Sequence, residues 1–343
     1  MKNMELKSVE DEKAWEIHKK AIIIDGCVLP LFNPDSVQRM MDGGLTGACV
    51  TVPSIDSSKP IPGFRSALEH IADRHHWIEQ NSDKTLLASN ATDIEKAKRE
   101  GKVAIILANQ NADIIEGNLR FLNIFHNLGV KICQLTYNYK NEIGDGAYER
   151  TDGGLSNFGI DVVKEMNRLN MLIDLSHVGK STTKETLELS KDPVITSHAN
   201  IKSLCDHARN KTDEQIKALA EKGGLMGITV FATFYKTKDN TQPTIENLVD
   251  CIEYVVDLVG INHVGIGTDL DEYMTKQRWA SYRRTFSKFV TPEAPYVRGL
   301  ENVESYFNLT KGLVARGYSE QEIMKILGGN FLRIFKEVCG NGL

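Results

Sequence analysis

Two histidines and an aspartate stand at or near the ends of three short apolar runs. His177 ends the run MLIDLSH, His198 lies near the end of VITSHAN, and Asp269 ends HVGIGTD. Counted at a period of two, His177 shares a strand face with Ile173 and Leu175, His198 with Val194 and Thr196, and Asp269 with Gly265 and Gly267. Two imidazoles and a carboxylate from three different strands can bind a zinc-like ion or transfer protons. We therefore expect His177, His198 and Asp269 to meet at one site.

Each of these residues also has a structural interpretation. A strand-end imidazole can simply hydrogen-bond a backbone group, and a carboxylate after a Gly-rich strand can cap the next helix. Two such histidines on successive strands favour a site. Asp25, which ends the first apolar run, is equally suited to reaching the site or to tying down the next loop. The remaining histidines lie mostly in helical or loop stretches, which indicates surface or helix positions: His18, His70, His75, His76, His126, His207 and His263.

The residues between these positions predict the scaffold. Eight β-rich apolar runs alternate with amphipathic segments that are long enough to cross back over a parallel sheet. This α/β pattern favours a closed (β/α)8 barrel of the TIM type over a doubly wound sheet, which would usually carry a nucleotide-binding turn. Such barrels keep their chemistry at the carboxyl ends of the strands, where Asn109, Gln110 and Tyr137 also lie. The runs begin at Ala21, Ala48, Val103, Val130, Met171, Val194, Leu225 and His263.

We expect a single domain over residues 1–343, because no linker, repeat or low-complexity tract interrupts the pattern. Three segments lie outside the eight repeats. Residues 85–99 form an added strand or helix, residues 303–338 form C-terminal helices outside the barrel, and residues 274–300 are long enough to act as a lid. The basic and aromatic residues of that last segment suit either an anionic or amine-bearing ligand or packing in a homodimer.

Composition excludes several classes of function. The net charge is −5 with both signs interspersed, so there is no basic surface for nucleic acid. No run approaches the roughly 20 apolar residues needed to span a membrane, and the charged N-terminus predicts a cytoplasmic protein. The six cysteines contain no CxxC pair, which is typical of reduced thiols. The chain also lacks a GxSxG elbow, an HExxH helix and a GxGxxG turn, and HVGKST lacks the first glycine of a P-loop.

Four segments, taken in order, resemble the membrane (renal) dipeptidase family of zinc metallopeptidases. They are LTYNYKNEIGDGAYERTDGGLSNFGIDVVKEMNRLNMLIDLSHVG, ITSHANIKSLCDHARN, HVGIGTDLD and LGGNFLRIF. The resemblance implies a metallo-dependent hydrolase barrel with two zinc ions at its mouth. It makes His177 and His198 ligands of one zinc and Asp269 a contact of the other zinc that handles protons. Arg209, followed by Asn210, would bind the substrate carboxylate, although an arginine there could also be an ordinary surface residue.

The chain departs from the family pattern at the second zinc. The family's first strand ends in DGHxD, whereas this chain has Asp25 followed by Gly26, Cys27, Val28 and Leu29. Cys27 could bind a metal as a thiolate, but Leu29 cannot bind one. The family's bridging glutamate falls on Gln110, a neutral amide, and a family histidine falls on Tyr137. Without a bridging carboxylate two dications would repel each other, so we expect one divalent ion or none.

The sequence therefore predicts a dipeptidase-like hydrolase that acts on an amide or related C–N bond of a small, dipeptide-like substrate. By resemblance the ion is zinc, held by His177 and His198, with Gln110 or Cys27 completing its ligands. Asp269 and Tyr137 are the expected catalytic residues, and Arg209 and Asn210 the expected substrate-binding residues. Two alternatives remain: a barrel that only binds an amino-acid-like ligand or a partner chain, and a metal-free enzyme that uses acid/base chemistry.

Overall fold

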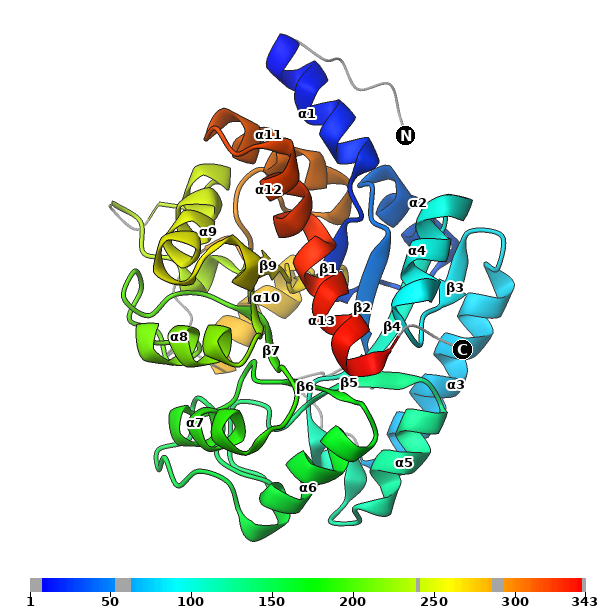
Figure 1. Cartoon of the computed structure of the whole chain (residues 1–343), viewed down its shortest axis with the longest axis vertical. Helices are drawn as coiled ribbons and strands as arrows, with labels where there is room; N and C mark the ends of the chain where they lie inside the picture. Colours follow the sequence, from blue (N-terminus) through cyan, green and yellow to red (C-terminus); the bar gives the residue numbers. More distant parts are fainter. Residues whose placement is uncertain (1–7, 53–62, 239–240, 286–292, 341–343) are drawn as a thin grey trace.

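The computed structural model describes residues 8–52, 63–238, 241–285 and 293–340, and its centre is a ring of parallel strands (Figure 1). The strands are β1 (Ile24–Leu29), β2 (Gly47–Thr51), β3 (Thr85–Leu87), β4 (Val103–Asn109), β5 (Val130–Gln134), β6 (Leu172–Asp174), β7 (Ile195–Ala199), β8 (Leu225–Ile228), β9 (Val264–Ile266) and β10 (Leu270–Asp271). The longer helices are α1 (Val9–Lys20), α2 (Pro34–Asp42), α3 (Phe64–Gln80), α4 (Ala91–Glu100), α5 (Arg120–Asn127), α6 (Asn157–Arg168), α7 (Lys180–Leu189), α8 (Asp213–Glu221), α9 (Ile245–Val259), α10 (Lys276–Thr285), α11 (Phe307–Ala315), α12 (Glu320–Met324) and α13 (Asn330–Cys339).

The ring closes between its first and last strands. Neighbours follow the order β1, β2, β4, β5, β6, β7, β8 and β9, and β10 pairs with β1. Only residues 267–269 separate β9 from β10, so these two short strands act as one interrupted strand. Each of the eight predicted runs contains or overlaps a strand of the ring. The expected (β/α)8 architecture is therefore confirmed.

The segment near residues 85–99 holds β3 and α4. β3 pairs with the first half of β4, where Thr85 lies opposite Val103. β5 pairs with the second half of β4, where Val130 lies opposite Leu107. The two short strands therefore share β4, and β3 adds no further position to the ring.

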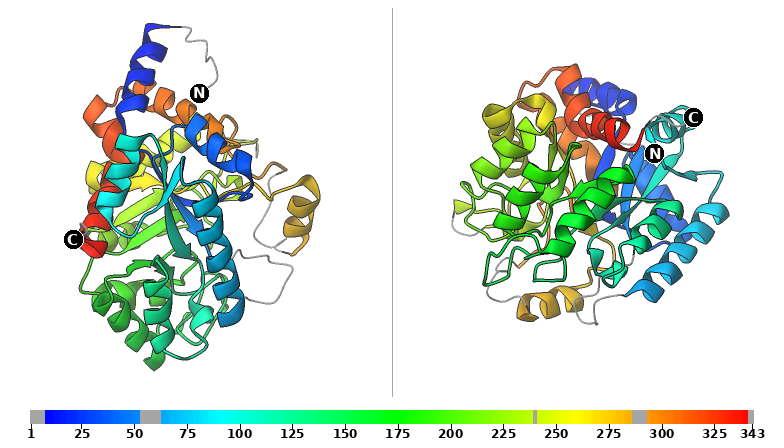
Figure 2. Two further views of the ribbon diagram at one scale, coloured as in Figure 1. Left: turned by 90° about the vertical axis from the view of Figure 1, so that its right-hand side faces the viewer. Right: turned by 60° about the horizontal axis from the view of Figure 1, so that its bottom comes forward.

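Helix α13 covers the amino-terminal end of the barrel, and Figure 1 shows it across the centre of the ring. Its Phe331 and Phe335 form one apolar cluster with interior residues of the strands, including Ile106, Ile132 and Leu172. α10 lies at the opposite end of the molecule (Figure 2). Since the barrel is packed at one end, a ligand has to bind at the carboxyl ends of the strands.

Strand faces in β6 and β7 differ from those predicted by period two. Leu172 belongs to the interior cluster, whereas Ile173 packs in the outer cluster with residues of α6. Thr196 likewise lies among residues of α7 and α8, outside the ring. The expectation that Ile173 shares a face with His177, and Thr196 with His198, was therefore wrong.

Two histidines outside the expected site are buried, His18 with 2% and His207 with 8% of its surface exposed. His18 lies on helix α1 as predicted, but it is not at the surface, because it hydrogen-bonds Thr310 and the carbonyl of Gly43. All six cysteines are unpaired. Within the described ranges no helix combines the length and the apolarity needed to cross a membrane. The cytoplasmic location stays a prediction.

Candidate active site

A small polar cavity opens where the strands of the ring end. Its free volume is about 50 Å³, enough for a water molecule or two but not for a dipeptide. Five of the residues predicted from the sequence line it, and α10 adds side chains from outside the barrel. The lining residues are Leu29, Gln110, Tyr137, Tyr148, His177, Arg209, Phe231, Phe234, Asp269, Asp271, Met274, Arg278 and Tyr282.

His177 and Asp269 reach the cavity from left-handed turns. β6 ends at Asp174 and β9 at Ile266, and the two residues follow with φ of 62° and 59°. Such a conformation is strained for residues other than glycine and is concentrated at functional sites. The turns explain why strand periodicity misplaced the faces but still identified these residues.

His198 is placed by an irregularity in β7. The register with β8 shifts between Thr196 and Ala199. Two glycines allow this, Gly227 on β8 and Gly267 just after β9, because a Cβ at either would lie 1.9 Å from the carbonyl oxygen of Ser197. The shift turns His198 toward the barrel mouth, although Thr196 faces the helices.

The two imidazoles face each other through their Nε2 atoms, which lie 2.9 Å apart. Each ring is held through its other nitrogen. Nδ1 of His177 contacts Oδ1 of Asn138 at 2.7 Å, and Nδ1 of His198 contacts Oγ of Ser197 at 2.7 Å. An imidazole fixed through Nδ1 is oriented to offer Nε2 to a metal ion.

Cys27 and Asp269 complete a group of donors around His198. One ligand atom of each of these three residues lies within 4.8 Å of the other two. The Cys27 thiol contacts Oδ1 of Asp269 at 3.7 Å and accepts a hydrogen bond from Nε2 of Gln110 at 3.0 Å. Leu29 also lines the cavity and has no donor atom. The donor set thus comprises nitrogen, sulfur and carboxylate oxygen, which suits zinc.

Arg209 is the more deeply buried of two arginines that line the cavity, and the other, Arg278, pairs with Asp271. Arg209 is 1% exposed, its Nη2 donates to the carbonyl of His198 at 3.2 Å, and its Nε and Nη1 have no partner among the described residues. A buried guanidinium with unused donors can form a forked contact with a carboxylate. Asn210 instead donates to the carbonyls of Cys205 and Phe234, so it supports the loop.

Burial dominates the electrostatics of the site. It lowers the pKa of His177 and of His198 well below the ordinary value, and Arg209 lowers both further. It also raises the pKa of Asp269 to about 7, although Arg209 acts in the opposite direction. Burial and the nearby Asp269 raise the pKa of the Cys27 thiol. Without a bound ion the imidazoles are neutral and Asp269 is poised to exchange a proton near neutral pH.

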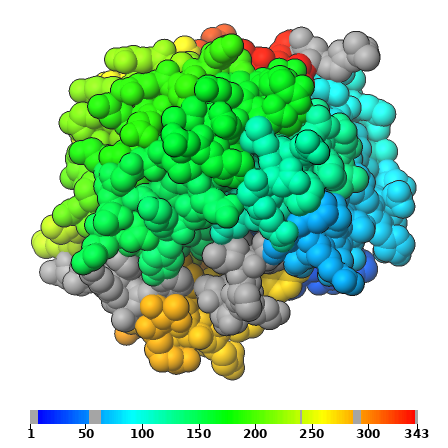
Figure 3. All heavy atoms as spheres, turned by 90° about the horizontal axis from the view of Figure 1, so that it is seen from below, coloured from blue at the N-terminus to red at the C-terminus, as the bar shows by residue number. Residues whose placement is uncertain are grey.

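Aromatic side chains form much of the wall. Tyr137 stacks on His177, with ring centroids 4.1 Å apart, and burial raises the pKa of its hydroxyl, so it is a hydrogen-bond donor rather than an anion. Phe231 packs against α10, where its ring contacts those of Trp279 and Tyr282. Figure 3 shows the α10 region projecting from the edge of the molecule.

Sequence reasoning missed the residues that hold the two imidazoles. Asn138, Asp174 and Ser197 are each at most 4% exposed and do not line the cavity. Their place next to predicted ligands could have indicated this role, because a histidine that binds a metal usually hydrogen-bonds a polar group through its other ring nitrogen. Asp25, whose role the sequence left open, accepts hydrogen bonds from Thr268 through both carboxylate oxygens and so ties β1 to the segment between β9 and β10. It does not line the cavity.

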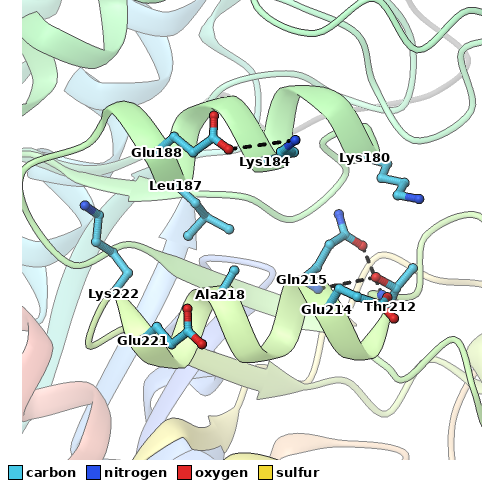
Figure 4. A pocket seen from close by; sticks show the side chains of 10 residues that line it. All are labelled: Lys180, Lys184, Leu187, Glu188, Thr212, Glu214, Gln215, Ala218, Glu221 and Lys222. Carbon is cyan, nitrogen blue, oxygen red and sulfur yellow. Dashed lines mark hydrogen bonds and ion pairs between the residues drawn. The ribbon is translucent and has the colours of Figure 1, made fainter.

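A larger hollow of about 500 Å³ lies between α7 and α8 (Figure 4). Its floor is Leu187 and Ala218, and its rims carry lysines and glutamates of both helices, such as the pair Lys184 and Glu188. It contains none of the strand-end residues that gather chemistry in a barrel. We therefore assign the chemistry to the smaller cavity.

Comparison with protein families gives one match over most of the chain. The model described as "Membrane dipeptidase (Peptidase family M19)" matches residues 12–279 and 291–341. Dipeptidase verJ of Clonostachys rogersoniana is 32% identical over 277 residues, which are 80% of this chain and 66% of that protein. The chain spans about two thirds of the length of the curated relatives it matches.

Solved structures agree with the fold. A crystal structure of an amidohydrolase from Pseudomonas aeruginosa is 37% identical with a TM-score of 0.86, and the match covers 95% of this chain and 98% of that chain. A metallopeptidase from Rhodobacter sphaeroides, bound to a phosphinate mimic of the dipeptide L-Ala-D-Ala, is 21% identical with a TM-score of 0.76. That match covers 93% of this chain and 100% of the other, and it shows the fold alone.

Proposed function

This chain belongs to the membrane dipeptidase family, and on that premise we propose that it hydrolyses an amide or related C–N bond in a dipeptide-like substrate. The observation that carries the proposal is the pair of Nε2 atoms at 2.9 Å beside Cys27 and Asp269. The cavity places His177 and Asp269 beside Arg209, whose Nε and Nη1 have no partner among the described residues, and this suits a substrate with a carboxylate close to its scissile bond. The dipeptide mimic bound to the Rhodobacter sphaeroides protein supports the same substrate class.

The donor set fits one divalent ion, with zinc as the family's metal. His177, His198 and the Cys27 thiolate would hold it, which leaves the fourth position of a tetrahedral site open and Asp269 beside it as a base. At the position of the family's second ion, Leu29 has no donor atom and Gln110 offers only a neutral amide, so the charge of a second ion would not be offset. A bound ion supplies a Lewis acid that polarises the amide carbonyl and lowers the pKa of water.

The chain's own residues orient the substrate and move the protons. Arg209 holds the substrate carboxylate through Nε and Nη1, the atoms that lack a partner. Asp269, whose carboxylate lies beside the donor atoms of His198 and Cys27, accepts the proton of the attacking water and returns it to the leaving amine. The Tyr137 hydroxyl donates to the substrate from above His177, and Phe231, Phe234 and Tyr282 exclude water.

One observation favours a second candidate, a barrel that binds an amino-acid-like ligand without hydrolysing it. The chain Asn138, His177, His198, Ser197 is continuously hydrogen-bonded through the contact between the two Nε2 atoms. If His177 carries its proton on Nε2 and Asn138 turns its unused NH2 group toward Nδ1 of that ring, both imidazoles are satisfied without a metal. Such a protein would be indifferent to chelators.

Metal analysis together with a dipeptide panel tests the proposal. Protein purified without added zinc should contain up to about one metal per chain and hydrolyse at least one dipeptide. The substitution His198→Gln should remove both properties, whereas His76→Gln, on the exposed face of α3, should change neither. If the protein contains no metal and hydrolyses no dipeptide, the proposed hydrolase activity is contradicted. The second candidate, a barrel that only binds a ligand, then remains.

A further inference from the structure

Asp174 and Ser197 form a buried relay behind His198 that the catalytic proposal does not use. Asp174 is 4% and Ser197 2% exposed. Oδ1 of Asp174 accepts the backbone N–H groups of Ser176 and Ser197, both at 2.9 Å. Oδ2 accepts the hydroxyl of Ser197 at 2.6 Å. The Ser197 oxygen in turn lies 2.7 Å from Nδ1 of His198.

The direction of each hydrogen bond follows from the number of protons. A serine hydroxyl has a single proton, and a carboxylate can only accept, so Ser197 donates to Asp174. The Ser197 oxygen is then an acceptor toward its other neighbours, the hydroxyl of Ser176 and the imidazole. Nδ1 of His198 must therefore carry the ring proton. The neutral ring leaves Nε2 with a free lone pair, which faces His177 and the donors around Cys27.

We propose that Asp174 is a positioning residue that acts through Ser197 to hold His198 in the Nδ1–H tautomer, so that Nε2 can bind a metal. The inference rests on the proposed function in treating His198 as a ligand. Asp174 touches neither the cavity nor the donor atoms. Its effect passes through one hydroxyl, whose proton must point away from the imidazole.

The substitution Asp174→Asn should reverse the direction of the hydrogen bonds in the relay, while the side chain keeps its size. The asparagine must keep Oδ1 toward the two N–H groups, because an NH2 group there would oppose two donors. Its Nδ2 then donates to Ser197, whose proton turns toward Nδ1 of His198. The imidazole must become the Nε2–H tautomer, and the lone pair that would bind the metal is lost.

Two measurements on the full chain test this inference. Nitrogen-15 NMR of histidine-labelled, metal-free protein reads the tautomer, and we expect Nδ1–H for His198 in the natural protein and Nε2–H in Asp174→Asn. Competition with a chromophoric chelator reads Zn²⁺ affinity, which should fall by about 10- to 100-fold in the variant. Ser197→Ala, which removes the hydroxyl, should weaken Zn²⁺ binding as well.

Asp25→Asn is the matched control. Asp25 also accepts two backbone N–H groups and a hydroxyl, that of Thr268, but this hydroxyl contacts no imidazole. It should cost similar stability and leave the His198 tautomer unchanged. An unaltered tautomer in Asp174→Asn, or a change of the His198 tautomer in Asp25→Asn as well, would overturn the relay. If the natural protein binds no Zn²⁺ but the tautomer still switches, the relay stands and the metal proposal fails.

Discussion

Cys27 and Gln110 determine how this site differs from the pattern its family resemblance implies. Their side chains contact each other at 3.0 Å, and Leu29 lines the same cavity. The sequence identified all three departures because each lies in a recognisable segment. It could not identify the contact between Cys27 and Gln110. That contact depends on how β1 and the end of β4, which flank β2, are placed in the ring.

Gln110→Glu should raise zinc occupancy only in part. A carboxylate beside Cys27 offsets the charge of a second cation, but Leu29 still supplies no ligand. Elemental analysis should give at most about one metal per chain in the natural protein, and close to two only when Cys27→His and Leu29→Asp are added. Two tightly bound metals in the unmodified protein would show that these departures do not matter.

Arg209→Lys should weaken substrate binding while leaving the fold intact. A lysine keeps the charge but loses the fork of Nε and Nη1, so KM for a dipeptide should rise by about 10- to 100-fold. Steady-state kinetics measure this effect. Arg74→Lys is the control, because Arg74 is also buried but packs on Phe32 outside the cavity. Equal KM values for the natural protein and Arg209→Lys would remove Arg209 from the binding site.

At the scale of elements, the repeating units were predictable and their ends were not. Alternating apolar runs predicted the strands, since burial on both faces makes parallel strands continuous in apolar residues. The turns that carry His177 and Asp269 are left-handed, and no local pattern marks such a turn in a residue other than glycine. The shared edge of β4 was equally hidden, because β3 and β5 each resemble a complete strand.

α10 provides a prediction about access to the cavity. A free volume of about 50 Å³ admits no dipeptide, so we expect α10 to move when substrate enters. Trp279 anchors the helix through Phe231 and through a hydrogen bond from its indole to the carbonyl of Glu293. Trp279→Ala should raise KM by about 10-fold and speed limited proteolysis at α10.

Trp15→Ala, on α1, is the control for loss of an indole. It should lower stability without changing KM or the proteolysis of α10. If Trp279→Ala matches the natural protein in both KM and protease resistance, α10 does not control access.

Helix α1 should make stability depend on pH through His18. Burial lowers the pKa of His18 to about 4, whereas the unfolded chain has about 6.5. Above pH 6.5 the residue is neutral in both states. As pH falls from 6.5 to 4 only the unfolded state gains the proton, so about 3 kcal/mol of stability is lost over that range.

Urea unfolding at several pH values checks this effect. In His18→Gln the free energy of unfolding should fall less steeply between pH 6.5 and 4 than in the natural protein. His263→Gln, in a partly exposed position, should keep the natural slope. Parallel curves for His18→Gln and the natural protein would contradict a buried neutral His18.

For the whole molecule, the sequence predicted the barrel, the family and the residues at its mouth. It did not predict the strand faces of β6, because His177 follows that strand in a left-handed turn. It also did not predict the faces of β7 or the position of Ser197, because both depend on a register shift that Gly227 and Gly267 allow. No sequence motif marks Asp174 or Ser197 as partners of the predicted ligand. Strand faces and hydrogen-bond partners therefore depend on contacts between distant parts of the chain, which local sequence patterns do not contain.

The central claim is that one divalent ion, held by His177 and His198, supports hydrolysis at the barrel mouth. The most direct test adds Zn²⁺ in steps to metal-free protein and measures dipeptide hydrolysis at each step. The account predicts no turnover without metal, a rise up to about one equivalent and a plateau beyond it. Turnover in the metal-free protein, or a rise that continues to two equivalents, would contradict it.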